Sequence, residues 1–379
     1  MRKAFILAAF LLCSLFVAAQ TVVHSAIVPD IPGYVILKGD MHLHTVFSDG
    51  NVWPASRVEE ALSEGLDFIA ITDHVEVGLT KKIRDGFFNC DRNKSFEIAA
   101  ETAKNRGLIV IHGGEITRGM PPGHFNATFV HDCEALSTAS SSGKNNFEAM
   151  MDALREARRQ GGFLVFNHPH WNRQAPNETV WYPEHSDIFA AGLMDGIEIF
   201  NHCDGYSPEA HHWAVERGLT VVSGTDAHRL LSSRVDYVGG AFRPMNLVFA
   251  TSRSEEAIRE ALKEGRNAVF AEGKVYGPAN CLRLLLDGIL RIESVRRTAK
   301  GVSIKIHNGT SIPVVLEKSG SQEYMYMRSV TVSPGAEYTI NVSSAERGKP
   351  VEGPVDIGYK VLNFFVDAGV PFDYNIHVD

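Results

Sequence analysis

From residue 34 onward the chain alternates between short apolar segments and longer segments in which apolar residues recur at helical spacing. The pattern predicts strands at 34–39, 67–72, 108–112, 124–131, 163–166, 196–200 and 219–223, and helices at 53–64, 95–106, 146–160, 208–217 and 254–264. Strands separated by helices form parallel sheets, because each crossover returns the chain to the same edge. The chain is therefore expected to form a barrel-like α/β fold.

Polar residues gather where these expected strands end. After the first strand come His42 and His44, and Asp49 follows in a Ser-Asp-Gly turn. In an extended segment residues i and i+2 point to the same face, so the two imidazoles project together and the turn brings the carboxylate back over them. Imidazole with carboxylate suits zinc, manganese or iron. Two unrelated histidines near a turn would be the alternative if this motif stood alone.

The pattern recurs at other strand ends, where the chain places His74, Glu115, His168, Asp226 and His228. Active sites of α/β barrels are built at the carboxyl ends of the strands, so these residues are expected to meet at one mouth. Burying several carboxylates and imidazoles together would cost several kcal/mol per charge unless a cation compensates them. A site for more than one metal ion is the simplest interpretation.

The combined motifs resemble those of the PHP (polymerase and histidinol phosphatase) superfamily of metal-dependent phosphoesterases. The motifs are His-x-His at 42–44, Ser-Asp-Gly at 48–50, Thr-Asp-His at 72–74, Gly-x-Glu at 113–115, His-Pro at 168–169 and Asp-x-His at 226–228. The resemblance covers roughly residues 34–270 and implies a distorted (β/α)7-type barrel. Residues 38–50, residues 115–127 and the β-rich C-terminal region further resemble the exported bacterial phosphodiesterases of the Sb-PDE type.

The resemblance implies two or three divalent metal ions, which would be zinc, manganese or iron. The first position would be held by His42, His44, Glu115 and Asp226, the second by Asp49, His74 and His228, and the third by Glu115, His168 and one more histidine. For that last ligand His124 is the first choice and His131 the second, because some relatives place a histidine where this chain has Asn126. A third position that is partial or empty remains an alternative.

Such a site would hydrolyse its substrate with a metal-bridging hydroxide. A water molecule between two cations has its pKa lowered toward neutrality, and the cations neutralise phosphate oxygens in the transition state. Asp226 could take the proton of that water, while His170 could line the pocket and protonate the leaving oxygen. Arg118 lies three residues after Glu115 and could clamp a phosphate oxygen, with a surface arginine as the alternative.

The character of the sequence changes after about residue 271. Short β-rich runs at 282–286, 289–295, 302–307, 314–317, 324–332, 338–342 and 361–366 are separated by Gly, Pro, Asn and Ser turns. They predict a small all-β domain, expected to be a sandwich. The expected organisation is a signal peptide at 1–19, a leader at 20–33, the barrel at 34–270 and the β-rich domain at 271–379.

The N-terminus and the overall charge bear on where the protein works and on its partners. Arg2 and Lys3 precede an apolar run from 4 to 19, which predicts a secretory signal peptide cleaved after Ala19. The run is too short for a comfortable transmembrane span, so the mature chain is expected to be periplasmic or secreted. A net charge of -8 without any run of Lys and Arg argues against a nucleic-acid partner. The expected partner is a small phosphorylated substrate, and the sequence does not define the oligomeric state.

The main expectation is an exported phosphodiesterase or phosphomonoesterase that acts on a small organic phosphate. The same site would also hydrolyse carboxylic or carbamate esters or amides, because a bridging hydroxide attacks carbonyl groups equally well. A glycan- or partner-binding protein with a relic barrel is an alternative of another class, which the complete ligand set disfavours. A DNA proofreading role, known for PHP domains in polymerases, is disfavoured by the expected export and by the acidity of the chain.

Overall fold

The computed structural model of the chain describes residues 24–76, 91–141, 145–172, 178–298, 300–320 and 322–379. The expected signal peptide and the first residues of the leader lie outside the described residues. Among the helices that are described, none is both long enough and apolar enough to cross a membrane.

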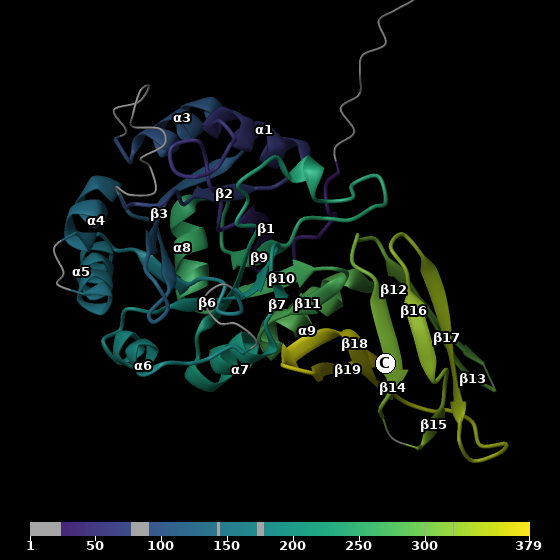
Figure 1. Cartoon of the computed structure of the whole chain (residues 1–379). Helices are drawn as coiled ribbons and strands as arrows, with labels where there is room; N and C mark the ends of the chain where they lie inside the picture. The colour runs from purple at the N-terminus through teal and green to yellow at the C-terminus, as the bar shows by residue number, and fades with distance from the viewer. Residues whose placement is uncertain (1–23, 77–90, 142–144, 173–177, 299, 321) are drawn as a thin grey trace, which may run out of the picture.

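Parallel strands form the frame of the N-terminal domain (Figure 1). They are β1 (Val35–Asp40), β2 (Phe68–Ile71), β3 (Ile109–Thr117), β5 (Phe163–Phe166), β6 (Gly196–Asn201) and β8 (Thr220–Gly224). β4 (His124–Thr128) runs antiparallel between β3 and β5, and β9 (Met245–Ala250) runs antiparallel beside β1. Every residue of β2, β5 and β8 is buried, as expected for strands covered on both faces. The parallel pairing brings the carboxyl ends of these strands to one edge.

Helices cover the outer face of this sheet. They are α1 (Pro54–Ser63), α3 (Lys94–Ala103), α4 (Cys133–Ser140), α5 (Asn146–Arg159), α6 (Pro183–Ala190), α7 (Pro208–Arg217) and α8 (Glu255–Lys263). Figure 1 shows α1 beside α3 at the top and α4 beside α5 at the left. In α5 the Asn145 side chain accepts a hydrogen bond from the Glu148 N–H, and Met150, Leu154 and Ala157 are buried on one face. A capped start and an apolar stripe thus explain why this segment is helical.

The barrel closes between β8 and the pair formed by β9 and β10 (Asn267–Ala271) through side chains. Asn246 Nδ2 donates to the Ser223 carbonyl at 2.7 Å, and its Oδ1 accepts the Ser223 N–H at 3.0 Å. Asn267 Nδ2 donates to the Val221 carbonyl at 2.7 Å. An asparagine side chain carries the donor and acceptor of a peptide group, so the two amides take the place of a strand ladder.

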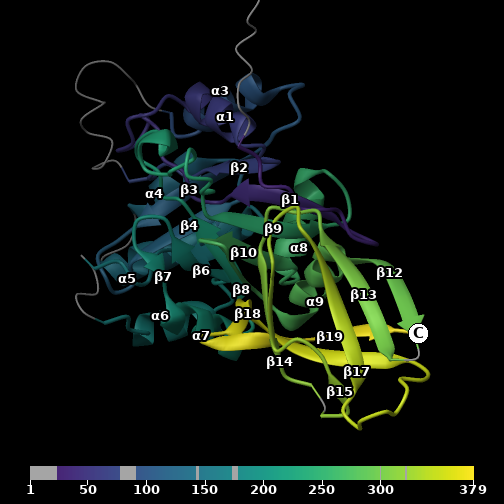
Figure 2. The same cartoon turned by 90° about the vertical axis from the view of Figure 1, so that its right-hand side faces the viewer.

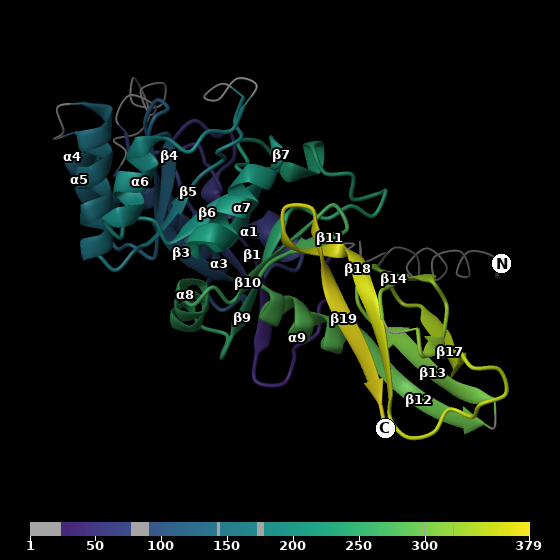
Figure 3. The same cartoon turned by 90° about the horizontal axis from the view of Figure 1, so that it is seen from below.

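The sheet continues into the C-terminal domain (Figures 2 and 3). β11 (Lys274–Tyr276) pairs with β10 and, in parallel, with β18 (Val355–Asp367), and β18 is flanked by β14 (Val314–Lys318) and β19 (Val370–Val378). β16 (Ser329–Val332) pairs with β14 at the edge of this sheet. A second sheet, formed by β12 (Leu290–Thr298), β13 (Gly301–Asn308), β17 (Glu337–Ser344) and β15 (Tyr324–Met325), shares its core with the first. The predicted α/β domain followed by an all-β domain is confirmed.

One predicted strand is wrong. Residues 282–286 belong to helix α9 (Ala279–Ile289), whose buried side chains are Cys281, Leu282, Leu285, Leu286 and Ile289. Their spacing is helical and leucine is a strong helix former, but a short apolar run is ambiguous when it is judged by periodicity alone. The run predicted at 324–332 is also divided, because the chain turns between β15 and β16.

The two domains share one apolar core, and this predicts the effect of a single substitution. Phe364 of β18 is fully buried in that core, whereas Leu362 of the same strand is 38% exposed. Phe364→Ala should lower the free energy of unfolding by about 3–5 kcal/mol, because it leaves a cavity that the neighbours fill only in part. Chemical denaturation measures the loss. Leu362→Ala is the matched control, and a loss as large as that of Phe364→Ala would contradict the shared core.

Candidate metal centre

The residues expected at strand ends meet at the carboxyl edge of the barrel. The Nε2 atoms of His42 and His44 lie 3.1 Å apart, and His44 Nε2 is 3.0 Å from Asp226 Oδ1. Glu115 closes this group, with Oε1 3.6 Å from His42 Nε2 and Oε2 3.5 Å from His44 Nε2. His42, His44 and Glu115 are each exposed by 1% or less. The structure therefore brings together the four residues expected at the first metal position.

Asp49, His74 and His228 form a second group beside His44. His228 Nε2 lies 3.1 Å from Asp49 Oδ2, and His74 Nε2 lies 3.4 Å from Asp49 Oδ1. The rings of His74 and His228 stack against His44 with centroid distances of 4.6 and 4.4 Å. Ligand atoms of all four residues lie within 4.8 Å of one another. This group contains the set expected at the second position, with His44 added.

The third group consists of Glu115, His124 and His168. Glu115 Oε1 lies 3.0 Å from His124 Nδ1 and 3.4 Å from His168 Nε2. The second-choice residue, His131, is exposed and does not belong to the ligand groups that the described residues form. The reason is that β4 runs antiparallel to β3 and β5, so His124 at its start lies at the mouth while Thr128 at its end, before His131, lies toward the opposite end of the barrel.

The hydrogen bonds of the imidazoles test whether this site fits metal ions. His42 Nδ1 lies 3.2 Å from Glu198 Oε1, and His228 Nδ1 lies 2.8 Å from the Asp226 carbonyl. Each of these acceptors holds the proton on Nδ1 and leaves the Nε2 lone pair facing the centre. Converging Nε2 lone pairs repel one another unless a cation lies between them. This is the arrangement of metal-bound histidine, so the residues fit divalent metal ions.

The charges of the cluster depend on one another. Burial opposes protonation of His42, but Asp226, Glu198 and Glu115 raise its pKa well above the usual value. Burial opposes ionisation of Glu115, yet the imidazoles, above all His74, hold its pKa well below the usual range. The pKa of Asp226 is also lowered against burial, chiefly by His42. The carboxylates therefore stay ionised, and the centre requires positive charge.

Glu198 supports this centre and was missed in the sequence. It lies within β6 and is 2% exposed. Besides holding His42, it accepts the His168 N–H at 2.7 Å through Oε2. A Cβ at Gly224 would overlap Glu198 Oε1 and the Cβ of His42, so glycine is the residue that fits beside them. The sequence carried one signal, a carboxylate in the middle of an apolar strand, which needs a partner when it is buried.

Buried polar side chains also fix the loops that carry the ligands. Arg57 donates through Nε to the His44 carbonyl at 3.0 Å and through Nη2 to the Ala227 carbonyl at 2.6 Å. Asp73 accepts hydrogen bonds from the Thr45 N–H at 2.7 Å and the Ser48 hydroxyl at 2.5 Å. The side chains of Arg57 and Asp73 therefore fix the backbone of the loops after β1 and β8, and with it the positions of the ligands.

Two ligands have backbone conformations that L-residues rarely adopt. His168 has a φ of 27° and Asp226 a φ of 51°. Such positions cost about 1–3 kcal/mol each and persist only where the surroundings enforce them. For Asp226 the enforcing contact includes its N–H, which donates to the His42 carbonyl at 2.9 Å. Strain at these ligands is consistent with a functional site.

The structure gives other partners to the two residues expected to contact substrate. The Arg118 guanidinium donates to Glu76 Oε1 at 2.8 Å and to the Thr117 carbonyl at 2.6 Å, and it contacts Ser140. His170 is exposed, and its Nδ1 lies 2.7 Å from Thr179 Oγ1. The phosphate contact of Arg118 and the proton transfer by His170 stay predictions.

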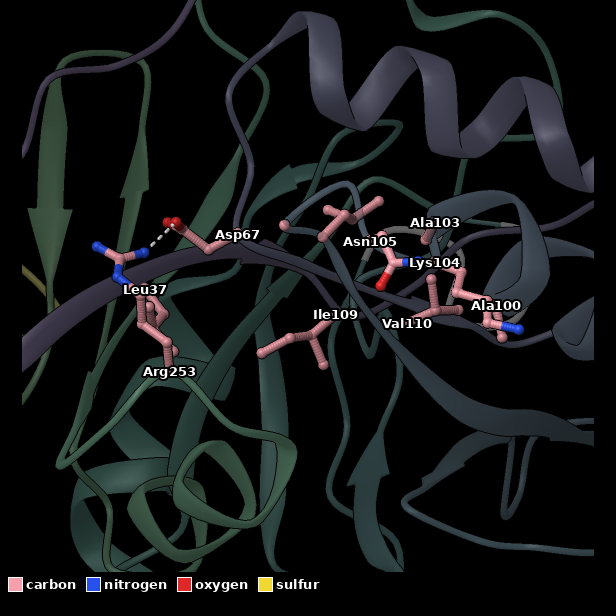
Figure 4. Close-up of a pocket in the computed structure, with 11 residues that line it drawn as sticks. Leu37, Asp67, Ala100, Ala103, Lys104, Asn105, Ile109, Val110 and Arg253 are labelled. Atoms are coloured by element: carbon pink, nitrogen blue, oxygen red, sulfur yellow. Dashed lines mark hydrogen bonds and ion pairs between the residues drawn. The ribbon is translucent and has the colours of Figure 1, made fainter.

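A hollow at the opposite end of the barrel is separate from this centre (Figure 4). It has a volume of about 360 Å³ and lies at the starts of β2 and β3, where Asp67 pairs with Arg253 at 2.6 Å. The labelled side chains in Figure 4 include Ile109 and Lys104 but no histidine. In α/β barrels this amino-terminal end serves stability, whereas the chemistry lies at the carboxyl ends.

The ligand groups and the barrel edge together define an α/β protein whose clustered histidines and carboxylates fit divalent metal ions. Residues 40–168 match the PHP domain and residues 290–377 match an Ig-like domain. A solved two-domain protein from Bacteroides vulgatus, described as containing a predicted PHP-like metal-dependent phosphoesterase, is 36% identical, with a TM-score of 0.84 over 93% of this chain and 98% of that one. The chain belongs to the PHP family, and that part of the sequence prediction is confirmed.

Two further similarities are more limited. An error-prone DNA polymerase of Nocardia farcinica is 35% identical over 83 residues, which are 21% of this chain and 6% of the polymerase. A histidinol phosphate phosphatase of Lactococcus lactis, solved with zinc, L-histidinol and phosphate, is 17% identical, with a TM-score of 0.30 over 62% of this chain and 97% of that one. This second likeness is too low to inform the site of the present chain.

The contact between Glu198 and His42 predicts a loss of metal affinity on substitution. Glu198→Gln weakens the acceptor that orients His42, so the affinity for metal should fall by about 10–100-fold. Competition with a chromogenic chelator measures the affinity. Glu209→Gln, at an exposed position of α7, is the matched control. Unchanged affinity in Glu198→Gln would show that this carboxylate does not orient the ligand.

Proposed function

We propose that the chain is a metal-dependent hydrolase that cleaves the phosphodiester or phosphomonoester bond of a small organic phosphate. The observation that carries this proposal is the convergence of four overlapping groups of His, Asp and Glu side chains at one barrel mouth, with the ligand atoms of each group within 4.8 Å of one another. The Bacteroides vulgatus protein supports it, because the similarity spans both domains and not the barrel alone.

The exposure of the carboxylates assigns their roles. Divalent cations held here would offset the negative charge that develops on a phosphate during hydrolysis. The side chain of Glu115 is 1% exposed, so this carboxylate serves as a buried ligand, whereas the side chain of Asp226 is 17% exposed at the mouth. Asp226 is therefore the better placed of the two to accept a proton from the attacking water.

Hydrolysis of carboxylic or carbamate esters or amides at the same centre is the competing function. The contacts of Arg118 support this competing function, because the arginine that is expected to bind phosphate already donates a hydrogen bond to Glu76. The binding-protein alternative receives less support, since a relic barrel has no reason to keep every ligand. The similarity to 6% of a polymerase gives no support for a nucleic-acid substrate.

Metal content and turnover should rise and fall together. Purified protein should contain about two or three equivalents of zinc, manganese or iron and should hydrolyse bis(p-nitrophenyl) phosphate, because the cations offset the charge of the phosphate. A chelator should abolish hydrolysis, and the metal should restore it. Elemental analysis and a colorimetric assay make these measurements.

His42→Ala should lose both metal and turnover in this assay, while the exposed His131→Ala should keep both. Bound metal with turnover of p-nitrophenyl acetate, but none of the diester, would favour the ester or amide alternative. Protein without metal after loading would overturn the site.

We also propose that the protein is exported, as the Sb-PDE type would be, and acts in the periplasm or outside the cell. The support is the basic and apolar N-terminus, since residues 1–19 have the order of a signal peptide. Mass spectrometry of the chain expressed in a bacterial host should find a mature N-terminus at Gln20. An intact Met1 with all of the protein in the cytoplasm would contradict export.

A further inference from the structure

The arginines near the mouth differ in what their guanidinium groups already contact. Arg57 is occupied by backbone carbonyls behind the ligand loops, and Arg243 is buried between Asp40 and Glu64. Arg118 is bonded to Glu76. None of these three is placed to meet a substrate without giving up an existing partner.

Arg234 lies in the connection between β8 and β9, on a segment that is held in place. The short helix η1 (Leu231–Ser233) precedes it, and the Arg234 N–H donates to the Leu231 carbonyl at 2.8 Å. Leu231 and Val235, on either side, are buried in the core beside α1. The Leu231 N–H also donates to Glu60 Oε1 at 2.8 Å. The backbone of Arg234 is therefore fixed, although its side chain is exposed.

The Arg234 guanidinium reaches the carboxyl end of β6. Its Nη1 lies 3.1 Å from the sulfur of Cys203, a free thiol just after that strand. The Cys203 N–H donates to Asn201 Oδ1 at 2.8 Å, and Asn201 Nδ2 donates to Glu198 Oε2 at 3.1 Å. The other Glu198 oxygen holds His42, so successive contacts connect Arg234 to the metal centre. Because β6 ends at Asn201, the partner thiol of Arg234 lies at the same carboxyl edge of the barrel as the metal ligands.

The thiol leaves the charge of Arg234 uncompensated. Burial raises the pKa of Cys203, and Asp226 adds to this effect, so the sulfur stays protonated. Within the described residues the guanidinium makes no ion pair, and its side-chain contact is with this sulfur. A neutral sulfur is a weak acceptor, so most donors of the guanidinium remain available.

We propose that Arg234 determines substrate preference by binding a second anionic group on the substrate, beside the phosphate that is hydrolysed. This inference rests on the proposed phosphoesterase function. The planar guanidinium binds carboxylate or phosphate through two parallel hydrogen bonds, so the favoured substrates are phosphate esters that carry a further carboxylate or phosphate. Such a substrate would place the phosphate that is hydrolysed at the metal centre and its second anionic group at Arg234.

A pair of competitors of the same carbon skeleton tests this proposal. Glycerol 3-phosphate and 3-phosphoglycerate differ in whether a terminal carboxylate is present, and both are measured as inhibitors of bis(p-nitrophenyl) phosphate hydrolysis by the metal-loaded protein. The carboxylate should strengthen inhibition by about tenfold, as expected for a charge-assisted hydrogen bond. The quantity compared between variants is the ratio of the inhibition constant of glycerol 3-phosphate to that of 3-phosphoglycerate. In Arg234→Met this ratio should fall to about one, and Arg234→Lys should keep part of the preference because the charge remains.

Arg229→Met is the matched control, since Arg229 is exposed in the same connection next to His228. It should keep the ratio of the unmodified protein. A ratio of one in the unmodified protein, or an unchanged ratio in Arg234→Met, overturns the role of Arg234. If the protein hydrolyses neither the diester nor p-nitrophenyl phosphate, the proposed function fails, and calorimetric titration of the same two compounds then tests Arg234 by the ratio of their dissociation constants.

Discussion

The structure depends on how the buried imidazoles are oriented. Glu198 fixes His42 through Nδ1, and the Asp226 carbonyl fixes His228 in the same way, so that the other ring nitrogen of each faces the centre. This requires acceptors behind the rings, and those acceptors must themselves be buried. Strands that end together at one edge of a barrel place the ligands at that edge, and residues within the strands place buried carboxylates behind the ligands. The fold can thus be understood as a support for orienting a few nitrogen lone pairs.

Much of this centre could be predicted from the sequence, for a physical reason. His42 and His44 are separated by the period of a strand, and strand ends such as Asp226 lie beside the glycines that permit sharp turns. The second choice, His131, lies away from the mouth because β4 runs antiparallel to its neighbours, and the strand's own pattern does not reveal its direction. Glu198 could not be assigned, since its role comes from its neighbours in the parallel sheet and not from its neighbours in the chain.

Contacts between distant segments also explain the remaining differences. The amides of Asn246 and Asn267 close the barrel, but an asparagine in an apolar strand does not reveal which backbone it will meet. The same applies to Arg118, whose partner Glu76 precedes it by about forty residues. Helix α9 was read as a strand because a leucine-rich run satisfies both patterns. The local sequence pattern predicts the helices and strands, whereas contacts between distant segments determine which side chains meet.

The sheet that crosses both domains bears on how the C-terminal domain contributes. β18 pairs in parallel with β11, and Tyr276 of β11 stacks between Tyr206 and Phe365 with ring centroids 4.5 and 5.5 Å apart. Tyr206 belongs to β7 (Gly205–Tyr206), which directly follows Cys203 and Asp204 at the rim of the metal centre. The Ig-like domain therefore contacts this segment through Tyr276, which lies between Phe365 and Tyr206. Because close-packed interiors have low compressibility, this stack limits how far the segment that holds the partner of Arg234 can move.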